Sequence, residues 1–283
     1  MAQFTNQAQL SYNNTITNSN IAVGEILEVL SATKTALTDS YVRNDNIVYI
    51  ISIINSGTVD INGLTITDNL GNYPLGENTT LTPLEYVDGS LRYYINGILQ
   101  SEPTVTSDPT LTITGINVPA EGNVIIIYET TTNQFAPLDV DSNITNTAVI
   151  SGGGITPITV TETVETQNAA DLTITKSISP VPVTENGRLT YTFYIQNSGN
   201  TGADTDSNIV ITDVFDPILT NITVTLNGST FPETSYSYDE TTGVFQTSAG
   251  SITVPAATYM QDPTDGRIII NPGIATFVIT GSV

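Results

Sequence analysis

The same short motifs occur twice along the chain in the same order, and this internal repeat constrains the fold more than any other feature. The two copies of each motif lie about 140 residues apart in a chain of 283 residues. A repeat of this length has the size of an ordinary domain, so the sequence predicts two domains of similar architecture. The matched pairs are FTNQA (4–8) with ITNTA (144–148), SATKT (31–35) with TITKS (173–177), INSGT (54–58) with QNSGN (196–200), TITDN (65–69) with VITDV (210–214), and NVPAEG (117–122) with TVPAAT (253–258).

Both copies are rich in short runs of β-branched and aromatic residues, which predict strands. Examples are NIVYIISIINSG (46–57) and RLTYTFYIQNSG (188–199), each broken at its end by Asn, Ser and Gly. The pairs Asn96-Gly97 and Asn227-Gly228 predict tight hairpins in comparable places of the two copies. We therefore expect an all-β chain that forms two tandem β-sandwiches.

Charge and composition exclude several classes of function. The formal charge is −22 with only six Lys and Arg residues, whereas binding to nucleic acid needs clustered cations. The chain has no Cys and no His, which removes disulfides, thiol nucleophiles, the usual zinc sites and Ser-His-Asp catalysis. No apolar run is long enough for membrane insertion. We expect no enzyme and no cofactor.

The two lysines of the chain, Lys34 and Lys176, are predicted to lie on the apolar faces of their strands. Alternate residues of a strand point to the same side of a sheet, so each lysine shares its side with the residues two and four positions away. These neighbours are Leu30, Ala32 and Ala36 for Lys34, and Leu172, Ile174 and Ile178 for Lys176.

The same alternation places one Asp and one Asn of each repeat on an apolar face. Burial lowers the pKa of a lysine and raises the pKa of a carboxyl group, so the amine becomes a nucleophile. A protonated Asp can then polarise an Asn carbonyl while the amine displaces ammonia, which gives a Lys–Asn isopeptide bond without a cofactor. The neighbours on these faces are Leu64, Ile66 and Leu70 for Asp68, Ile209, Ile211 and Phe215 for Asp213, Ile144, Ala148 and Ile150 for Asn146, and Phe4, Ala8 and Leu10 for Asn6.

The pattern LTITK…LTYTFYIQNSGNT…ITD resembles a repeat of bacterial and archaeal surface proteins that is catalogued as a domain of unknown function. That repeat is similar to the collagen-adhesin B-type and related immunoglobulin-like domains of Gram-positive surface proteins and pili. The resemblance covers both halves, from about Leu27 to the end. It implies tandem immunoglobulin-like sandwiches, a surface or fibre location, and isopeptide bonds between a Lys of the first strand and an Asn of the last.

This resemblance also implies roles for the matched residues. The B-type domains usually use Glu as the proton shuttle, so an Asp in that role is a departure from their pattern. The implied self-cross-linking sets are Lys34, Asp68 and Asn146 within one chain, and Lys176, Asp213 and Asn6 between chains.

The N-terminal motif FTNQAQL resembles the closing strand of a domain, ITNTAVI, although it lies at the start of the chain. In the second copy no such strand follows before Val283. We expect residues 1–26 to form a donor strand, hairpin and connector, 27–166 the first sandwich, and 167–283 a second sandwich that lacks its final strand. The donor residues that would complete the second sandwich of a neighbouring copy are Phe4, Asn6, Ala8 and Leu10.

A head-to-tail contact that does not close gives a filament, so the sequence predicts a self-assembling extracellular fibre whose partner is the same chain. Two alternatives stay open. The N-terminal strand, followed by a hairpin around Asn13-Asn14, could fold back within one molecule; or the chain could be a monomeric adhesin or stalk module that binds a carbohydrate or host protein. The segment MAQFTNQAQLSYNN lacks the features of a signal peptide, which fits release by lysis and a cell or spore surface.

Simpler structural roles compete with these assignments. The lysines could protect strand edges or form ionic pairs only, and the two aspartates could cap turns. Asn55 and Asn197 also share an apolar face, but each precedes Ser-Gly, so a turn role is favoured over an amide-donor role. The acidic loops are weak calcium candidates without the helix–loop–helix motif, and their residues are Asp139, Asp141, Asp204 and Asp206.

Overall fold

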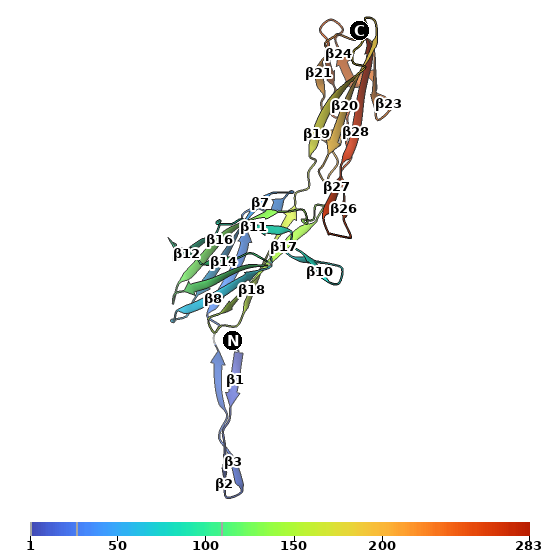
Figure 1. Cartoon of the computed structure of the whole chain (residues 1–283). Helices are drawn as coiled ribbons and strands as arrows, with labels where there is room; N and C mark the ends of the chain where they lie inside the picture. Colours follow the sequence, from blue (N-terminus) through green and yellow to red (C-terminus); the bar gives the residue numbers. More distant parts are fainter. Residues whose placement is uncertain (1, 27, 109) are drawn as a thin grey trace. The chain divides into compact units, whose positions relative to one another are not determined.

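The computed structural model describes residues 2–26, 28–108 and 110–283, and within them the chain is all-β (Figure 1). It divides into two compact units, which comprise Met1–Asn133 with Ile144–Val164, and Gln134–Asn143 with Glu165–Val283. The domain boundary expected at residue 27 falls outside the described residues. The described part of the chain holds no helix with the length and apolar character that a membrane crossing requires.

The N-terminal segment forms one long antiparallel hairpin (Figure 1). At its tip Asn13 and Asn14 have φ values of 44° and 63°, the left-handed conformation that Asn tolerates and a tight hairpin turn needs. The hairpin expected around these residues is therefore confirmed. All side chains from Phe4 to Val23 are exposed. Its strands are β1 (Ala2–Asn6) paired with β4 (Ala22–Ile26), and β2 (Gln9–Tyr12) paired with β3 (Thr15–Asn18).

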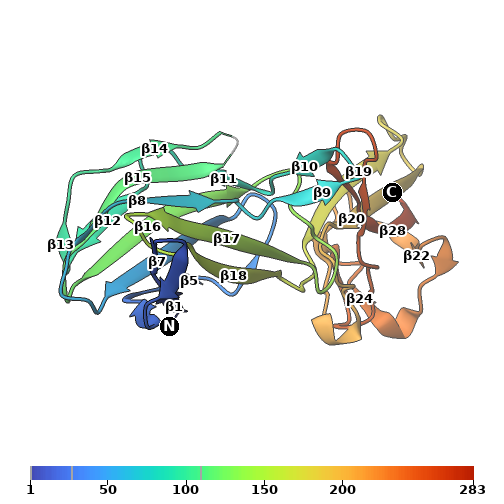
Figure 2. The ribbon, with the colours of Figure 1, turned by 90° about the horizontal axis from the view of Figure 1, so that it is seen from below.

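The first sandwich has two sheets, which we call the lysine sheet and the aspartate sheet after the residues that they carry (Figure 2). In strand order, the lysine sheet is β13 (Ile98–Leu99), β12 (Arg92–Ile95), β16 (Asn123–Thr132), β7 (Asn46–Asn55) and β5 (Leu30–Ala36), with β11 (Leu84–Tyr86) also paired to β16. The aspartate sheet is β14 (Thr104–Thr106), β15 (Leu111–Val118), β8 (Ile61–Asp68), β17 (Asn143–Gly152), β18 (Ile158–Thr166) and β6 (Ser40–Tyr41). A short hairpin joins β9 (Tyr73–Leu75) to β10 (Thr79–Leu81).

The inner faces of these sheets follow the alternation of the sequence. Along β7 the side chains of Ile47, Tyr49, Ile51 and Ile53 are fully buried, while the residues between them are partly exposed. Such regular burial of β-branched and aromatic side chains is the main stabilising contribution to a sandwich core.

The second sandwich has a lysine sheet and a smaller aspartate sheet. The lysine sheet is β19 (Leu172–Ser179), β20 (Arg188–Asn197), β28 (Gly273–Ser282), β22 (Thr220–Leu226) and β23 (Ser229–Thr230). The aspartate sheet is β21 (Thr212–Val214), β25 (Val244–Thr247) and β24 (Tyr236–Tyr238). The remaining elements are the hairpin β26 (Thr258–Gln261)–β27 (Ile268–Asn271) and two single-turn 3-10 helices, Thr205–Ser207 and Glu233–Ser235.

The two sandwiches share their strand order up to one point. Apart from β11, the lysine sheets match strand for strand, and β14-β15-β8 of the first aspartate sheet corresponds to β24-β25-β21 of the second. The first sheet then continues with β17, β18 and β6, whereas among the described residues no strand pairs with the free edge of β21. Among the described residues β17, β18 and β6 have no counterparts in the second sandwich, and of these β17 and β18 are neighbours in the sheet and consecutive in the chain. The expectation that the second sandwich lacks its final strand stays a prediction.

Candidate functional site

The Lys34 amine lies in the interior of the first sandwich. Lys34 is on the edge strand β5, opposite Ile51 of β7, and is only 4% exposed. Its Nζ lies 2.5 Å from Oδ2 of Asp68, and both side chains are fully buried. The lysine comes from one sheet and the aspartate from the other, so the ion pair joins the two layers across the core.

Asp68 is held by three donors at the end of β8. Besides the Lys34 amine, the Tyr128 hydroxyl donates to Oδ2 at 2.5 Å, and the backbone N–H of Leu70 donates to Oδ1 at 2.9 Å. Separation of Lys34 from Asp68 would leave an uncompensated charge in the core, and the free-energy cost of that state holds the two side chains together.

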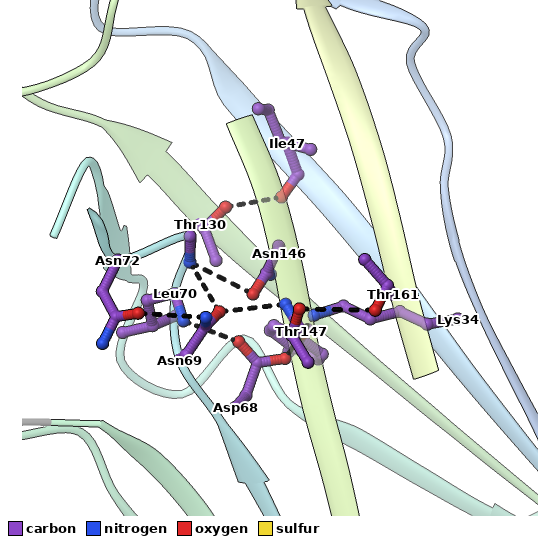
Figure 3. Close-up of polar contacts among 12 residues, drawn as sticks. Lys34, Ile47, Asp68, Asn69, Leu70, Asn72, Thr130, Asn146, Thr147 and Thr161 are labelled. Carbon is purple, nitrogen blue, oxygen red and sulfur yellow. Dashed lines mark hydrogen bonds and ion pairs between the residues drawn. The ribbon is translucent and has the colours of Figure 1, made fainter. Parts of the chain in front are cut away.

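Asn146 lies next to this pair on β17. Ala148 is opposite Asp68 in the β17–β8 ladder, so Asn146, two residues earlier on the same face, lies at the turn that follows β8. The Gly71 N–H donates to Oδ1 of Asn146 at 3.3 Å. Figure 3 shows Lys34, Asp68 and Asn146 converging from three strands. Among the described residues the buried Nδ2 of Asn146 has no hydrogen-bond partner, a state that costs about 1–3 kcal/mol.

Two stacked tyrosines enclose the amine. The rings of Tyr49 and Tyr128 lie 5.7 Å apart, and the Lys34 amine is 4.8 Å and 6.0 Å from their centroids. Burial raises the pKa of both tyrosines, the charge of Asp68 raises it further, and the nearby Asn146 amide acts in the opposite direction. Burial lowers the pKa of Lys34, although Asp68 opposes that shift.

This arrangement contains the parts that amide transfer needs. Proton transfer from Lys34 to Asp68 gives a neutral amine, which is a nucleophile, and a carboxylic acid, which is a proton donor. The Gly71 N–H is placed to stabilise charge on the amide oxygen of Asn146. The amide nitrogen that would leave as ammonia is the atom without a partner.

The second sandwich carries a matching pair in a more open setting. Lys176 on β19 is opposite Phe193 of β20 and forms an ion pair with Asp213 of β21. Its amine lies 4.5 Å from the ring centroid of Tyr191 and 5.6 Å from that of Phe215. The side chains of Lys176 and Asp213 are nevertheless 39% and 17% exposed.

The open setting goes with the bare edge of β21, where the described residues place no counterpart of β17 and β18. In the first sandwich Glu162 of β18 accepts a hydrogen bond from the Ala36 N–H at 3.2 Å, so β18 reaches across to β5. In the second sandwich every residue of β19 is exposed, including the apolar Leu172, Ile174 and Ile178 at 38%, 54% and 44%. The side of β19 that is predicted to face a core is therefore uncovered.

The proposed donor residues lie on the exposed N-terminal hairpin. Phe4 and Leu10 are 54% and 60% exposed, and Asn6 and Ala8 are exposed beside them. One site of three residues, Lys34, Asp68 and Asn146, is thus brought together within the first sandwich. The set of Lys176, Asp213 and Asn6 is divided between the second unit and the hairpin.

The competing structural roles can be judged from hydrogen bonds. Asn197 accepts from the N–H groups of Asp171 and Gly199 at 2.9 Å, and donates to backbone carbonyls of Thr201 and Pro255. Asn55 makes a similar set, so the preferred turn role of both residues is confirmed.

The acidic loops also make local contacts. Asp204 accepts from the Asp206 N–H and caps a 3-10 turn, and Asp141 accepts from the Asn168 amide at 3.3 Å. Within the described ranges no cluster of three or more potential metal-binding side chains occurs.

Four residues around the Lys34 site were not predicted from the sequence. Tyr49 and Tyr128 share the buried parity of their strands, so the alternation rule could have identified them. The roles of Gly71 and Glu162 depend on a turn with a φ of 70° and on a contact between sheets, which no local pattern predicts. Asn146 is on the penultimate strand of its sandwich rather than the last, because β18 follows it.

No protein-family model and no curated protein sequence matches the chain. Solved structures with similarity include the collagen-binding subdomain of the Enterococcus faecalis surface protein ACE, at 10% identity and a TM-score of 0.33 over 50% of this chain and 99% of that one. The major pilin subunit BcpA of Bacillus cereus has 12% identity and a TM-score of 0.36 over 96% and 73% of the two chains. The pilus backbone RrgB of Streptococcus pneumoniae has 13% identity and a TM-score of 0.35, over 86% of this chain and 55% of that one. These are adhesin and pilin proteins, as the sequence resemblance implies, but at this level of similarity they identify neither a family nor a function.

Proposed function

We propose that this chain is the structural subunit of a self-assembling filament at a cell or spore surface, in which the N-terminal segment of one copy completes the second sandwich of the next. The observation that carries the proposal is the difference between the two aspartate sheets. In the first, β17 covers the edge of β8; in the second, the corresponding edge of β21 is bare within the described residues. This role requires no enzymatic turnover.

The N-terminal strand fits that edge in sequence and in register. FTNQAQL matches ITNTAVI of β17 at a constant offset, so Asn6 takes the place of Asn146 and Ala8 that of Ala148. Because Ala148 is opposite Asp68, the match puts Ala8 opposite Asp213. Main-chain pairing along β21 would then satisfy an open edge, as in β-strand addition.

Burial supplies the driving force for this contact. The apolar side chains of β19, notably Ile174 and Ile178, are exposed in the free subunit, and so are Phe4 and Leu10 of the N-terminal hairpin. Each such side chain contributes about 1.5–3 kcal/mol when fully removed from water. Docking of the donor beside β21 would bury both sets of apolar side chains in one core.

Isopeptide bonds would make the assembly covalent. In the first sandwich the Lys34 nitrogen attacks Cγ of Asn146, the new C–N bond forms, the old C–N bond breaks, and ammonia leaves with a proton delivered by Asp68. At the junction Lys176, Asp213 and Asn6 of the neighbouring copy would repeat the reaction. There the position opposite Tyr191 is Ile279, whereas Tyr128 is opposite Tyr49, so the junction lacks one hydroxyl that binds the aspartate in the first sandwich.

The test is whether the purified chain forms fibres and whether it needs its N-terminus. Electron microscopy and sedimentation of the full chain should show filaments, and a variant that lacks residues 2–12 should stay monomeric. A monomeric full chain that binds a carbohydrate or host protein would instead support the adhesin or stalk function. Fibres formed by the truncated variant would overturn strand donation.

A further inference from the structure

We propose that the donated element is the whole N-terminal hairpin, and that it fills the places of both β17 and β18 in the neighbouring subunit. This inference rests on the proposed filament. A donor of one strand would have to separate β1 and β2 from β4 and β3 before docking. A donor of two strands docks as it is already folded.

The first support is the turn at the tip. Asn13 and Asn14 have φ values of 44° and 63°, and Gly153 and Gly154, which begin the connection from β17 to β18, have φ values of 57° and 77°. These two turns lie 140 residues apart, the same offset that relates Asn6 to Asn146. The N-terminal hairpin and the β17–β18 hairpin thus reverse direction at equivalent positions of the repeat.

The second support is the pairing between the strands. In the N-terminal hairpin Thr5 is opposite Val23, and Ala2 is opposite Ile26. In the first sandwich the Thr145 and Thr163 hydroxyls are 3.0 Å apart, and the Thr166 N–H donates to the Ser142 carbonyl at 2.8 Å. Subtracting 140 from each residue number converts the second set of pairs into the first. The hairpin therefore carries the β17–β18 register in the free subunit.

The third support is the chemistry of the two faces. The first strand places Phe4, Asn6, Ala8 and Leu10 on the face that would enter the core, and Thr5, Gln7 and Gln9 on the other. Opposite the core face of β1 lie Ala22 and the small Gly24, which Phe4 covers so closely that a Cβ on Gly24 would meet its ring at 2.4 Å. A compact second strand of this kind can lie beside β19 without displacing Phe4.

The outward pair Thr5 and Val23 provides the decisive variant, because the chain has no native Cys. The double substitution Thr5→Cys with Val23→Cys should form an intramolecular disulfide, since directly opposed residues of an antiparallel pair are within disulfide reach. The Cys pair matches Thr145 and Thr163, which are exposed on the first sandwich, so the disulfide would face solvent in the assembled state.

We expect the oxidised, locked variant to form filaments at the same rate and to the same extent as its reduced form. Hydrogen exchange of the fibre should protect residues 15–24 as well as residues 4–12. If only the reduced form assembles, or only residues 4–12 become protected, the donor is a single strand and the hairpin inference fails while the filament remains. If neither form nor the parent chain assembles, the filament proposal itself fails. The substitution pair Thr145→Cys with Thr163→Cys is the matched control for the effect of a disulfide on a folded hairpin.

Discussion

Lys34 and Lys176 occupy the same position of the two repeats and pair with matching aspartates, yet the side chain of Lys34 is 0% exposed and that of Lys176 is 39% exposed. The difference lies in what covers each pair. The β17–β18 hairpin lies over the first pair, and the described residues offer no equivalent strands over the second. The exposure of each lysine thus depends on whether strands lie beside the aspartate strand of its sandwich.

Labelling of amines can follow this exposure directly, because these are the two lysines of the chain. We expect an amine-reactive reagent to modify Lys176 in the free subunit and to leave Lys34 unmodified. In filaments Lys176 should become protected, since the donated hairpin covers it. Peptide mass mapping reads out both sites. Equal labelling of Lys176 in subunits and filaments would contradict strand donation at β21.

The intact mass tests the cross-link in the first sandwich. The full chain as a monomer should be lighter than its calculated mass by one ammonia, and Lys34→Met, Asp68→Asn and Asn146→Ala should each restore the calculated mass. Loss of the bond in Asn146→Ala should lower the free energy of unfolding by about 4–5 kcal/mol, by the chain-entropy scale for a closed loop of roughly 100 residues. An unmodified mass in the parent chain would mean that the Lys34–Asp68 pair is ionic only.

Asn6 separates strand exchange from covalent locking. We expect Asn6→Ala to assemble into filaments that fall apart in hot detergent, because the main-chain pairing stays and the amide that Lys176 would attack is gone. Gln7→Ala, on the opposite face of the same strand, is the matched control and should give ladders that survive boiling. Detergent-resistant ladders from Asn6→Ala would assign the bond to another residue.

Alkaline pH should destabilise the first sandwich through its tyrosines. The pKa values of Tyr49 and Tyr128 are raised above their ordinary value of 10.0 by burial, so the folded state holds protons that the unfolded state releases. Their contribution to stability is complete below pH 10 and is lost as the pH rises above it. Lys34 has the opposite sign, because its lowered pKa makes stability rise with pH below 10.5.

The Asn146→Ala variant cannot form the cross-link, so its stability reports the ionisable groups alone. Its free energy of unfolding, measured in urea between pH 7 and 11, should therefore rise to a maximum and then fall. Tyr49→Phe should weaken the fall above pH 10. A stability that keeps rising to pH 11 would contradict the buried setting of the two tyrosines.

Much of the site could be predicted from the alternation of residues, and its limits are physical. Parity correctly placed Lys34, Asp68 and Asn146 on inner faces, since the period of a strand depends only on the local backbone. Parity also placed Lys176 inward, but whether that side is covered depends on strands distant in sequence. Only the strand order of both sheets shows that β17, β18 and β6 follow β8 in the first sandwich while no described strand lies beside β21 in the second.

Disulfide trapping between two copies tests the strand register most directly. Val149 is opposite Thr67 in the β17–β8 ladder, so the proposed junction places Gln9 of one copy opposite Thr212 of the next. When a Gln9→Cys subunit is mixed with a Thr212→Cys subunit and oxidised, the account predicts a disulfide-linked dimer that neither variant forms alone, and little or none with Gln7→Cys, two residues out of register. No dimer from the mixture, or a disulfide that closes within one dilute monomer carrying both substitutions, would contradict it.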